Sequence, residues 1–173
     1  VGVYPDGTVE VKGLTGKKSH TPEFIKRTFY EVLEILSKVE SKGDFEKDRE
    51  EIRAKRRKAY LDLKNRKVPL EDLAFRVMLS KPIEKYVDTT PPHVKAAMLL
   101  QRRGKEVKPG DIIAYVKTIG GLGVKPVELA KIEEVDAEKY VDYMRSTFEQ
   151  LLDSLGYEFD EIMGATRLED FFW

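Results

Sequence analysis

Apolar residues recur every three or four positions between Pro22 and about Ser41, which predicts an amphipathic helix. Its apolar stripe consists of Phe24, Phe29, Val32, Leu33, Ile35, Leu36 and Val39. Thr21 is a suitable N-cap, and Pro22 suits the first helical position because its missing N–H needs no partner there. The first long element is therefore expected to be a helix with one buried face.

A second long helix is expected to have little apolar surface. Gly43 should interrupt the first helix, and Asp44 can cap a second one that runs from Phe45 to about Arg66. Its apolar positions are sparse: Phe45, Ile52, Tyr60, Leu61 and Leu63. Much of this helix should therefore face solvent or a ligand.

The rest of the chain alternates short strands with helices. Helical segments are expected at 70–73, at 93–103 up to Gly104, and at 135–155 up to Gly156. Alternating or β-rich stretches between turn residues predict strands at Val1–Tyr4, Thr8–Val11, Ala74–Leu79, Asp111–Lys117 and Val124–Ala130. The expected fold class is α+β, mainly helical, with short antiparallel strands.

Composition narrows the class of function. Charged residues make up 36% of the 173 residues, well above the usual quarter. This excess suits a protein that binds a polyelectrolyte, and it also suits a thermophilic protein whose own surface is rich in ion pairs. Residues 1–127 hold 27 Lys and Arg against 18 Asp and Glu, whereas residues 128–173 hold 4 against 13. Residues 1–127 are therefore basic and residues 128–173 acidic. This division favours a polyanionic partner for the basic region. With no Cys and two His, disulfides, thiolate sites and a His-only zinc site are excluded.

The second helix concentrates positive charge. Its basic residues are Arg53, Lys55, Arg56, Arg57, Lys58, Lys64, Arg66 and Lys67. One interpretation is a row of phosphate contacts along a duplex, with Arg56 and Arg57 as candidates. The other is a solvated helix whose cations pair with the preceding acids, namely Glu46, Asp48, Glu50 and Glu51.

Few residues suggest chemistry of their own. His93 follows Pro91 and Pro92 at a helix start, where it could meet a phosphate or cap its own helix. The loop 119–123 is glycine-rich but lacks the Lys-Ser/Thr of a P-loop and precedes a strand, which indicates a hairpin. No acidic pair has the setting of a two-metal site, so no catalytic and no metal-binding residue is predicted.

The C-terminal segment carries a cluster of aromatic residues. Leu168, Phe171 and Phe172 would share one face of a helical turn. Such an apolar face is either an association site or packed against the core of the same chain.

Three stretches together resemble the last part of an archaeal, replicative family B DNA polymerase. The first stretch is similar to the last palm strand of that family and comprises residues 9–14. The second is similar to part of the thumb and comprises residues 79–86 and 92–97. The third continues the thumb and comprises residues 104–116. Residues 140–161 resemble the closing thumb helices. The similarity covers nearly the whole chain.

The resemblance implies a domain organisation: residues 1–20 end the palm, 21–163 form the thumb, and 164–173 are a tail. Thumbs of this family hold the primer–template duplex through its phosphates and minor groove. The positions carried over as DNA-binding are Lys12, Lys81, Lys85, His93 and Lys117. Tyr86 and Tyr115 are interpreted as packing residues. The catalytic palm motif with paired aspartates is absent, so no cofactor is expected in this chain and Mg²⁺ is expected in the palm of the parent polymerase.

The tail also resembles a sliding-clamp-binding box, in which Gln precedes an aliphatic residue and an aromatic pair. Leu168, Phe171 and Phe172 match this box, but Ala165 stands where Gln is expected, which should weaken binding.

The partners implied are double-stranded DNA, a sliding clamp, the rest of the polymerase chain and small accessory subunits, in the archaeal cytoplasm near the nucleoid. No membrane contact is expected, because no run of 18 apolar residues occurs. Two alternatives stay open: a stand-alone, non-catalytic adaptor for DNA and clamp, and an independent enzyme. Val1 in place of Met suggests that the chain begins inside a larger protein.

Overall fold

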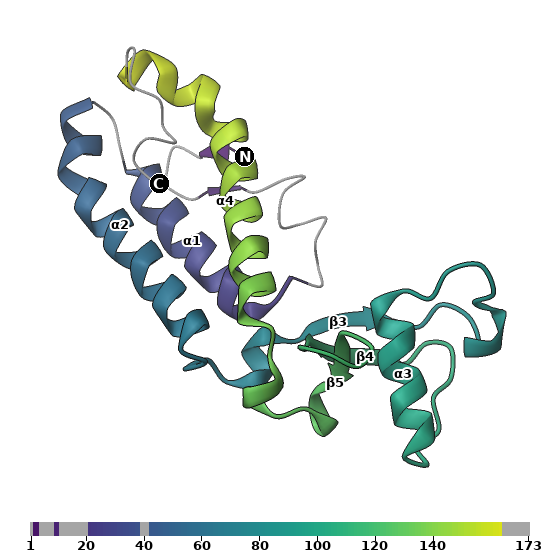
Figure 1. Ribbon diagram of the computed structural model, residues 1–173. Helices are drawn as coiled ribbons and strands as arrows, with labels where there is room; N and C mark the ends of the chain where they lie inside the picture. Colours follow the sequence, from purple (N-terminus) through teal and green to yellow (C-terminus); the bar gives the residue numbers. More distant parts are fainter. Residues whose placement is uncertain (1, 4–8, 11–20, 39–41, 164–173) are drawn as a thin grey trace.

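The computed structural model describes residues 2–3, 9–10, 21–38 and 42–163 (Figure 1). The described part is mainly helical, with two small antiparallel sheets, as the sequence predicted. The first sheet pairs β1 (Gly2–Val3) with β2 (Val9–Glu10), which confirms the two N-terminal strands. None of the described helices is long and apolar enough to cross a lipid bilayer.

Three long helices form a bundle, seen side by side in Figure 1: α1 (Glu23–Ser37), α2 (Lys42–Lys64) and α4 (Ala137–Met163). The predicted stripe of α1 lies inside this helix bundle, where burial of its apolar side chains stabilises the fold. The buried α1 residues are Phe24, Ile25, Thr28, Phe29, Val32, Leu33 and Leu36. Phe29 meets Phe148 of α4 with ring centroids 6.2 Å apart.

The start of α1 differs from the prediction. Pro22 occupies the N-cap position, and no side chain caps the helix. Thr21 is instead buried, with its Oγ1 3.3 Å from the hydroxyl of Tyr143 on α4. Thr21 thus bonds a residue of a distant helix and not the first turn of the helix that follows it. Of the predicted C-terminal part of this helix, residue 38 is the cap and residues 39–41 lie outside the described residues.

Two glycines predicted to end helices lie inside them. α2 begins at Lys42, so Gly43 and Asp44 are helical, and α4 passes through Gly156 to Met163. A helical glycine costs about 1 kcal/mol relative to alanine. Packing of long helices against each other outweighs that cost. Asp136 caps α4, since its Oδ1 accepts the N–H of Lys139 at 3.3 Å.

The end of α2 is fixed by Arg66, which has a positive φ of 54°. The N–H of Lys67 donates to Asp62 at 2.9 Å and that of Arg66 to Leu63 at 3.2 Å, the two bonds of a Schellman motif. Arg66 occupies the position that glycine usually takes. Its Nε donates to the carbonyl of Val135 at 3.3 Å, which ties the end of α2 to the segment before α4.

The second sheet contains β3 (Phe75–Met78), β4 (Ile112–Lys117) and β5 (Val124–Pro126), antiparallel and in that order. α3 (Pro92–Arg102) packs on β4 and β5. We call residues 75–126 the sheet unit. The strand expected at 124–130 is shorter than predicted, because a 3-10 turn at Val127–Leu129 follows Pro126. The predicted helix start at Val135 is also wrong: this residue bridges to Thr118.

Aromatic rings join the sheet unit to the helix bundle. Phe75 stacks on Tyr115 at 5.3 Å between centroids and contacts Tyr140 and Tyr143 of α4 at 5.9 and 5.4 Å. The fully buried Tyr140 hydroxyl donates to the carbonyl of Leu73 at 2.7 Å. It also accepts the N–H of Lys117 at 3.0 Å. The Tyr140 side chain of α4 thus forms hydrogen bonds with the segment just before β3 and with the last residue of β4.

Candidate nucleic-acid interface

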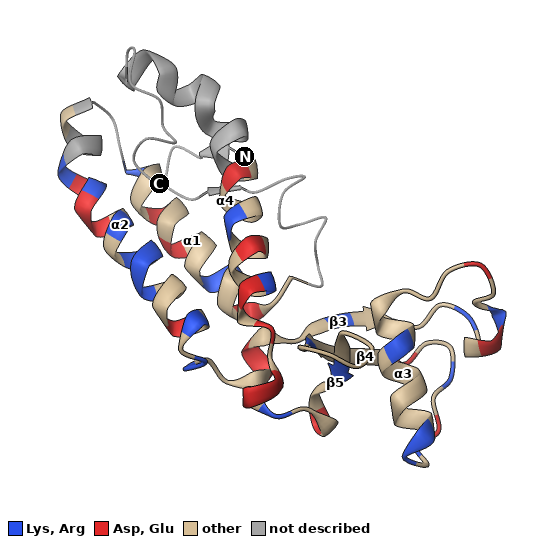
Figure 2. Ribbon diagram, in the orientation of Figure 1, with Lys and Arg blue, Asp and Glu red and all other residues tan. Residues whose placement is uncertain are grey.

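Positive charge in excess lies mainly in the sheet unit. Residues 75–126 hold ten Lys and Arg but four Asp and Glu, whereas residues 21–74 hold 14 against 12. Along α2, Figure 2 shows basic and acidic residues intermixed. The net attraction for a polyanion is therefore larger over the sheet unit than over residues 21–74.

Most cations of the sheet unit have no acidic partner among the described residues. Lys105 pairs with Glu128 and Lys125 with Glu134. The other eight make no ion pair with the described part of the chain: Arg76, Lys81, Lys85, Lys95, Arg102, Arg103, Lys108 and Lys117. Their charges are available to a ligand.

Three of the predicted DNA-binding residues lie around one loop. Lys81 follows β3, Lys85 ends the 3-10 turn at Ile83–Lys85, and His93 lies in the first turn of α3. Both lysines are exposed and His93 is half-buried. Tyr86 lies between Lys81 and His93. The Nζ of Lys81 lies 4.6 Å from the centroid of the Tyr86 ring, and the His93 ring meets the Tyr86 ring edge-on at 6.2 Å between centroids.

His93 does not cap its own helix. Pro91 is the N-cap residue of α3 and no side chain caps it, so that interpretation was wrong. The N–H groups of Val94 and Lys95 donate to the Pro91 carbonyl at 3.0 and 3.1 Å. The backbone itself therefore satisfies these donors, and the His93 side chain lies against Tyr86 instead.

Lys117 lies apart from this loop. Leu79 pairs with Asp111 at one end of the β3–β4 ladder, and Lys117 ends β4 at the other. Six residues of strand put the two ends about 20 Å apart. Lys117 is half-buried with its Nζ 5.3 Å from the Phe75 ring centroid. Burial and, next, Lys139 lower the pKa of Lys117, while Asp136 acts in the opposite sense.

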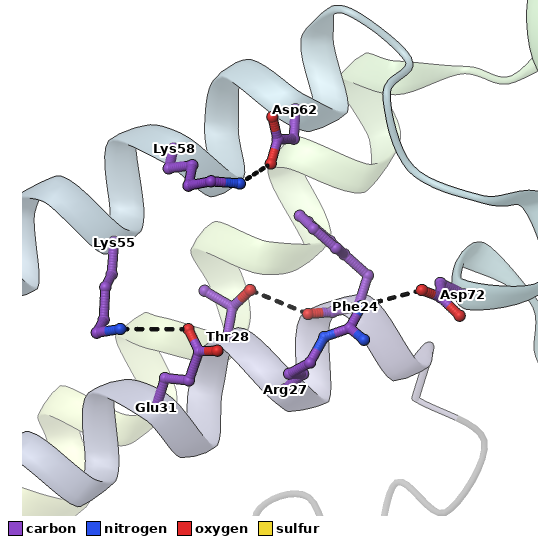
Figure 3. A network of polar contacts seen from close by, with 8 residues as sticks. All are labelled: Phe24, Arg27, Thr28, Glu31, Lys55, Lys58, Asp62 and Asp72. Carbon is purple, nitrogen blue, oxygen red and sulfur yellow. Dashed lines mark hydrogen bonds and ion pairs between the residues drawn. The ribbon is translucent and has the colours of Figure 1, made fainter.

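The basic helix is largely engaged within the helix bundle. Figure 3 shows Lys55 beside Glu31 of α1 at 3.7 Å and Lys58 beside Asp62 at 2.8 Å. In the same view Arg27 of α1 binds Asp72 at 2.9 Å. These acids are not the ones that the sequence suggested, apart from Glu50, which lies 3.8 Å from Arg53. The solvated-helix interpretation thus holds for part of α2: Glu31 comes from α1, whereas Asp62 and Glu50 lie about one turn from their partners on α2 itself.

Arg56 and Arg57 differ from each other. Arg57 is exposed and has no acidic partner among the described residues. Arg56 is half-buried, and its pKa is lowered by burial and by the neighbouring Arg53 and Arg145. Both line a groove of about 440 Å³ between α2 and α4, whose other walls include Tyr60, Leu61, Val141, Met144 and Arg145. They therefore lie on a different part of the molecule from Lys81.

Sequence reasoning did not single out five of these eight cations of the sheet unit: Arg76, Lys95, Arg102, Arg103 and Lys108. Lys95 and Arg102 are seven residues apart on α3, hence two turns apart on one face. The sequence shows this spacing, but only the packing of α3 on β4 and β5 determines which face of the helix points outward.

Some predictions fall outside the described residues, namely Lys12, Leu168, Phe171 and Phe172. Within the described residues, no three His, Asp or Glu side chains come together as a metal site would require. The prediction that Mg²⁺ binds elsewhere in a parent polymerase stays a prediction.

Comparisons with protein-family models and with individual proteins all match DNA polymerases. The family model described as DNA polymerase family B matches residues 3–156 of this chain. DNA polymerase 1 of Sulfolobus acidocaldarius is 46% identical over 171 residues, which are 99% of this chain and 20% of that protein. DNA polymerase 1 of Saccharolobus solfataricus is 47% identical, again over 99% of this chain and 19% of the relative.

A solved structure is similar as well. The family B DNA polymerase from the hyperthermophilic archaeon Pyrobaculum calidifontis superposes with a TM-score of 0.61 and 28% identity. The match covers 74% of this chain and 17% of that one. This chain spans about a fifth of the length of the curated relatives that it matches.

Proposed function

This chain belongs to DNA polymerase family B, and on that premise we propose that it holds the primer–template duplex through the phosphate backbone. Residues 1–20 are the end of a palm domain, 21–163 a thumb, and 164–173 a tail that tethers the polymerase to a sliding clamp. The parent protein is a DNA-directed DNA polymerase whose magnesium-binding carboxylates lie outside this chain. This chain is inactive by itself.

One observation carries the proposal: eight cations of the sheet unit have no acidic partner among the described residues. A duplex carries one negative charge per about 1.7 Å of its axis, and cations that replace its counterions supply sequence-independent affinity. Cations already paired within the protein must first break that pair. The sheet unit is therefore better suited to bind phosphates than α2 is.

The residues assigned to the duplex follow from exposure. Lys81 and Lys85 are exposed, and His93 lies beside them. Lys117 contributes less, because half-burial and the Phe75 ring restrict its ammonium group. Of the two α2 arginines predicted to bind DNA, Arg57 is exposed and Arg56 lies deeper in the α2–α4 groove.

The test measures duplex binding by fluorescence anisotropy across a potassium chloride series, with two duplexes of unrelated sequence. The affinity of the 173-residue chain should fall linearly on a log–log scale. Lys81→Ala and Lys85→Ala should each reduce the slope by about 0.9 and weaken both duplexes alike.

Lys58→Ala is the matched control. Lys58 is an exposed lysine like Lys81, but it pairs with Asp62 at 2.8 Å. Its removal should leave the slope unchanged. A chain that ignores duplex at low ionic strength would disprove the proposal, and so would equal losses for the Lys58 and Lys81 variants. Arg57→Ala, measured in parallel, reports whether α2 adds a phosphate contact.

A further inference from the structure

Tyr86 lies at the centre of the loop that bears the candidate phosphate-binding residues. It follows the 3-10 turn at Ile83–Lys85, and its N–H donates to the Ile83 carbonyl at 3.1 Å. The side chain is half-buried and packs against the hydrophobic core. The backbone and the core thus hold this ring in place within an otherwise exposed segment.

Three polar or charged side chains contact the Tyr86 side chain, each at a different part. Its hydroxyl lies 3.1 Å from the Oγ of Ser80. The Nζ of Lys81 lies 4.6 Å from the ring centroid, within the range of a cation–π interaction. The ring of His93 meets it edge-on at 6.2 Å, with an angle of 89° between the planes. Residues 13 positions apart in the sequence are thereby held by one ring.

We infer that Tyr86 is a positioning residue, which orients Lys81 and His93 toward one stretch of phosphate backbone. The inference rests on the proposed function. It also replaces the interpretation of Tyr86 as a packing residue alone, since the ring contacts polar and charged groups as well as the core.

The physical reason is the mobility of lysine. A free lysine side chain loses rotamer freedom when it binds a phosphate, and that loss reduces the affinity. A lysine already held over a ring has lost part of that freedom before binding. Its ammonium group has three donors, so it can face the ring and still donate to a phosphate oxygen.

The chain contains a matched control for this arrangement. On α2 the Nζ of Lys64 lies 5.5 Å from the ring centroid of Tyr60 and donates to its hydroxyl at 3.2 Å. The Tyr60–Lys64 pair likewise holds a lysine beside a tyrosine, here through a hydrogen bond to the hydroxyl, and it lies in the helix bundle. A general effect of removing a tyrosine beneath a lysine would appear at both positions, whereas a positioning effect on the duplex would appear only at Tyr86.

The experiment is a double-mutant cycle on duplex affinity at fixed low salt. Tyr86→Leu should weaken binding by roughly 2–5-fold, the equivalent of an exposed cation–π contact. In a Lys81→Ala background the same change should have a smaller effect. Tyr86→Phe keeps the ring and should restore affinity to within about twofold of the wild type. Tyr60→Leu should leave the affinity unchanged.

A second measurement does not depend on any variant at Tyr86. Reductive ¹³C-dimethylation labels the lysines while keeping their charge, and Lys81→Arg identifies the Lys81 signal. In the wild type this signal should be shifted upfield by the ring current of Tyr86. A Lys81 signal at the position of a free lysine would overturn the inference even if Tyr86→Leu failed to fold.

The outcomes separate the two proposals. If the wild type does not bind duplex, the proposed function fails. If Lys81→Ala weakens binding but Tyr86→Leu does not, the function stands and the positioning role is wrong. If Tyr86→Leu and Tyr60→Leu weaken binding equally, the effect is general and the positioning role is again wrong.

Discussion

The hydroxyl of Tyr140 should be worth several kcal/mol to the stability of the fold. It donates to the carbonyl of Leu73 at 2.7 Å and accepts the N–H of Lys117 at 3.0 Å, and the side chain is fully buried. The same burial raises the pKa of Tyr140, so the hydroxyl stays protonated and able to donate. Tyr140→Phe removes this hydroxyl and keeps the ring.

The magnitude follows from the two groups left without a partner. Each buried donor or acceptor that loses its partner costs about 1–3 kcal/mol. Lys117 is half-buried, so water can partly replace its bond, and the expected loss is about 2–4 kcal/mol in total. That is a large share of the roughly 5–15 kcal/mol by which domains are stable.

Urea unfolding followed by circular dichroism measures the change, read as a lower midpoint at unchanged slope. Tyr115→Phe is the matched control, because Tyr115 is also buried but its hydroxyl makes no hydrogen bond within the described residues. This control should lose little or no stability. The reasoning is refuted if Tyr140→Phe is no more destabilising than Tyr115→Phe.

Two further predictions concern alkaline pH and the tail. Burial, and next Tyr143, raise the pKa of Tyr115 to about 12, whereas an unfolded tyrosine ionises near about 10. The free energy of unfolding should therefore be unaffected by this group below about pH 10 and should fall toward pH 12, because only the unfolded chain releases the proton in that window. Urea unfolding across this range should show a smaller fall for Tyr115→Phe; equal falls would contradict the assignment. Phe171→Ala combined with Phe172→Ala should abolish clamp binding in a pull-down while duplex affinity stays unchanged. If these side chains belong to the core instead, the melting temperature will drop, since each buried Phe truncation costs about 3–5 kcal/mol.

The apolar pattern predicted most elements of the fold. The stripe of α1, the helical turn at 70–73, the strands of the sheet unit and α3 follow from spacing and from turn residues, which act locally. Element ends were less predictable. Thr21 was expected to cap α1 but bonds Tyr143, 122 residues away, and Gly156 was expected to end α4 but lies inside it. Long-range packing outweighs such local signals.

The candidate interface was predictable only in part. Lys81, Lys85 and His93 do lie around one loop, whereas Lys117 lies at the far end of the sheet. The contacts of Tyr86 with Ser80, Lys81 and His93 were not predicted from sequence, because they depend on how the loop folds back onto α3.

The sequence by itself determined the helical and strand periods, the excess of positive charge before residue 128 and the membership of DNA polymerase family B. Only the tertiary structure decided which positive charges remain available. The basic run on α2 is the densest in the chain, yet Lys55 faces Glu31 of α1. The physical reason is that an ion pair depends on distance in space: Glu31 lies 24 residues before Lys55, and folding brings the two side chains within 3.7 Å.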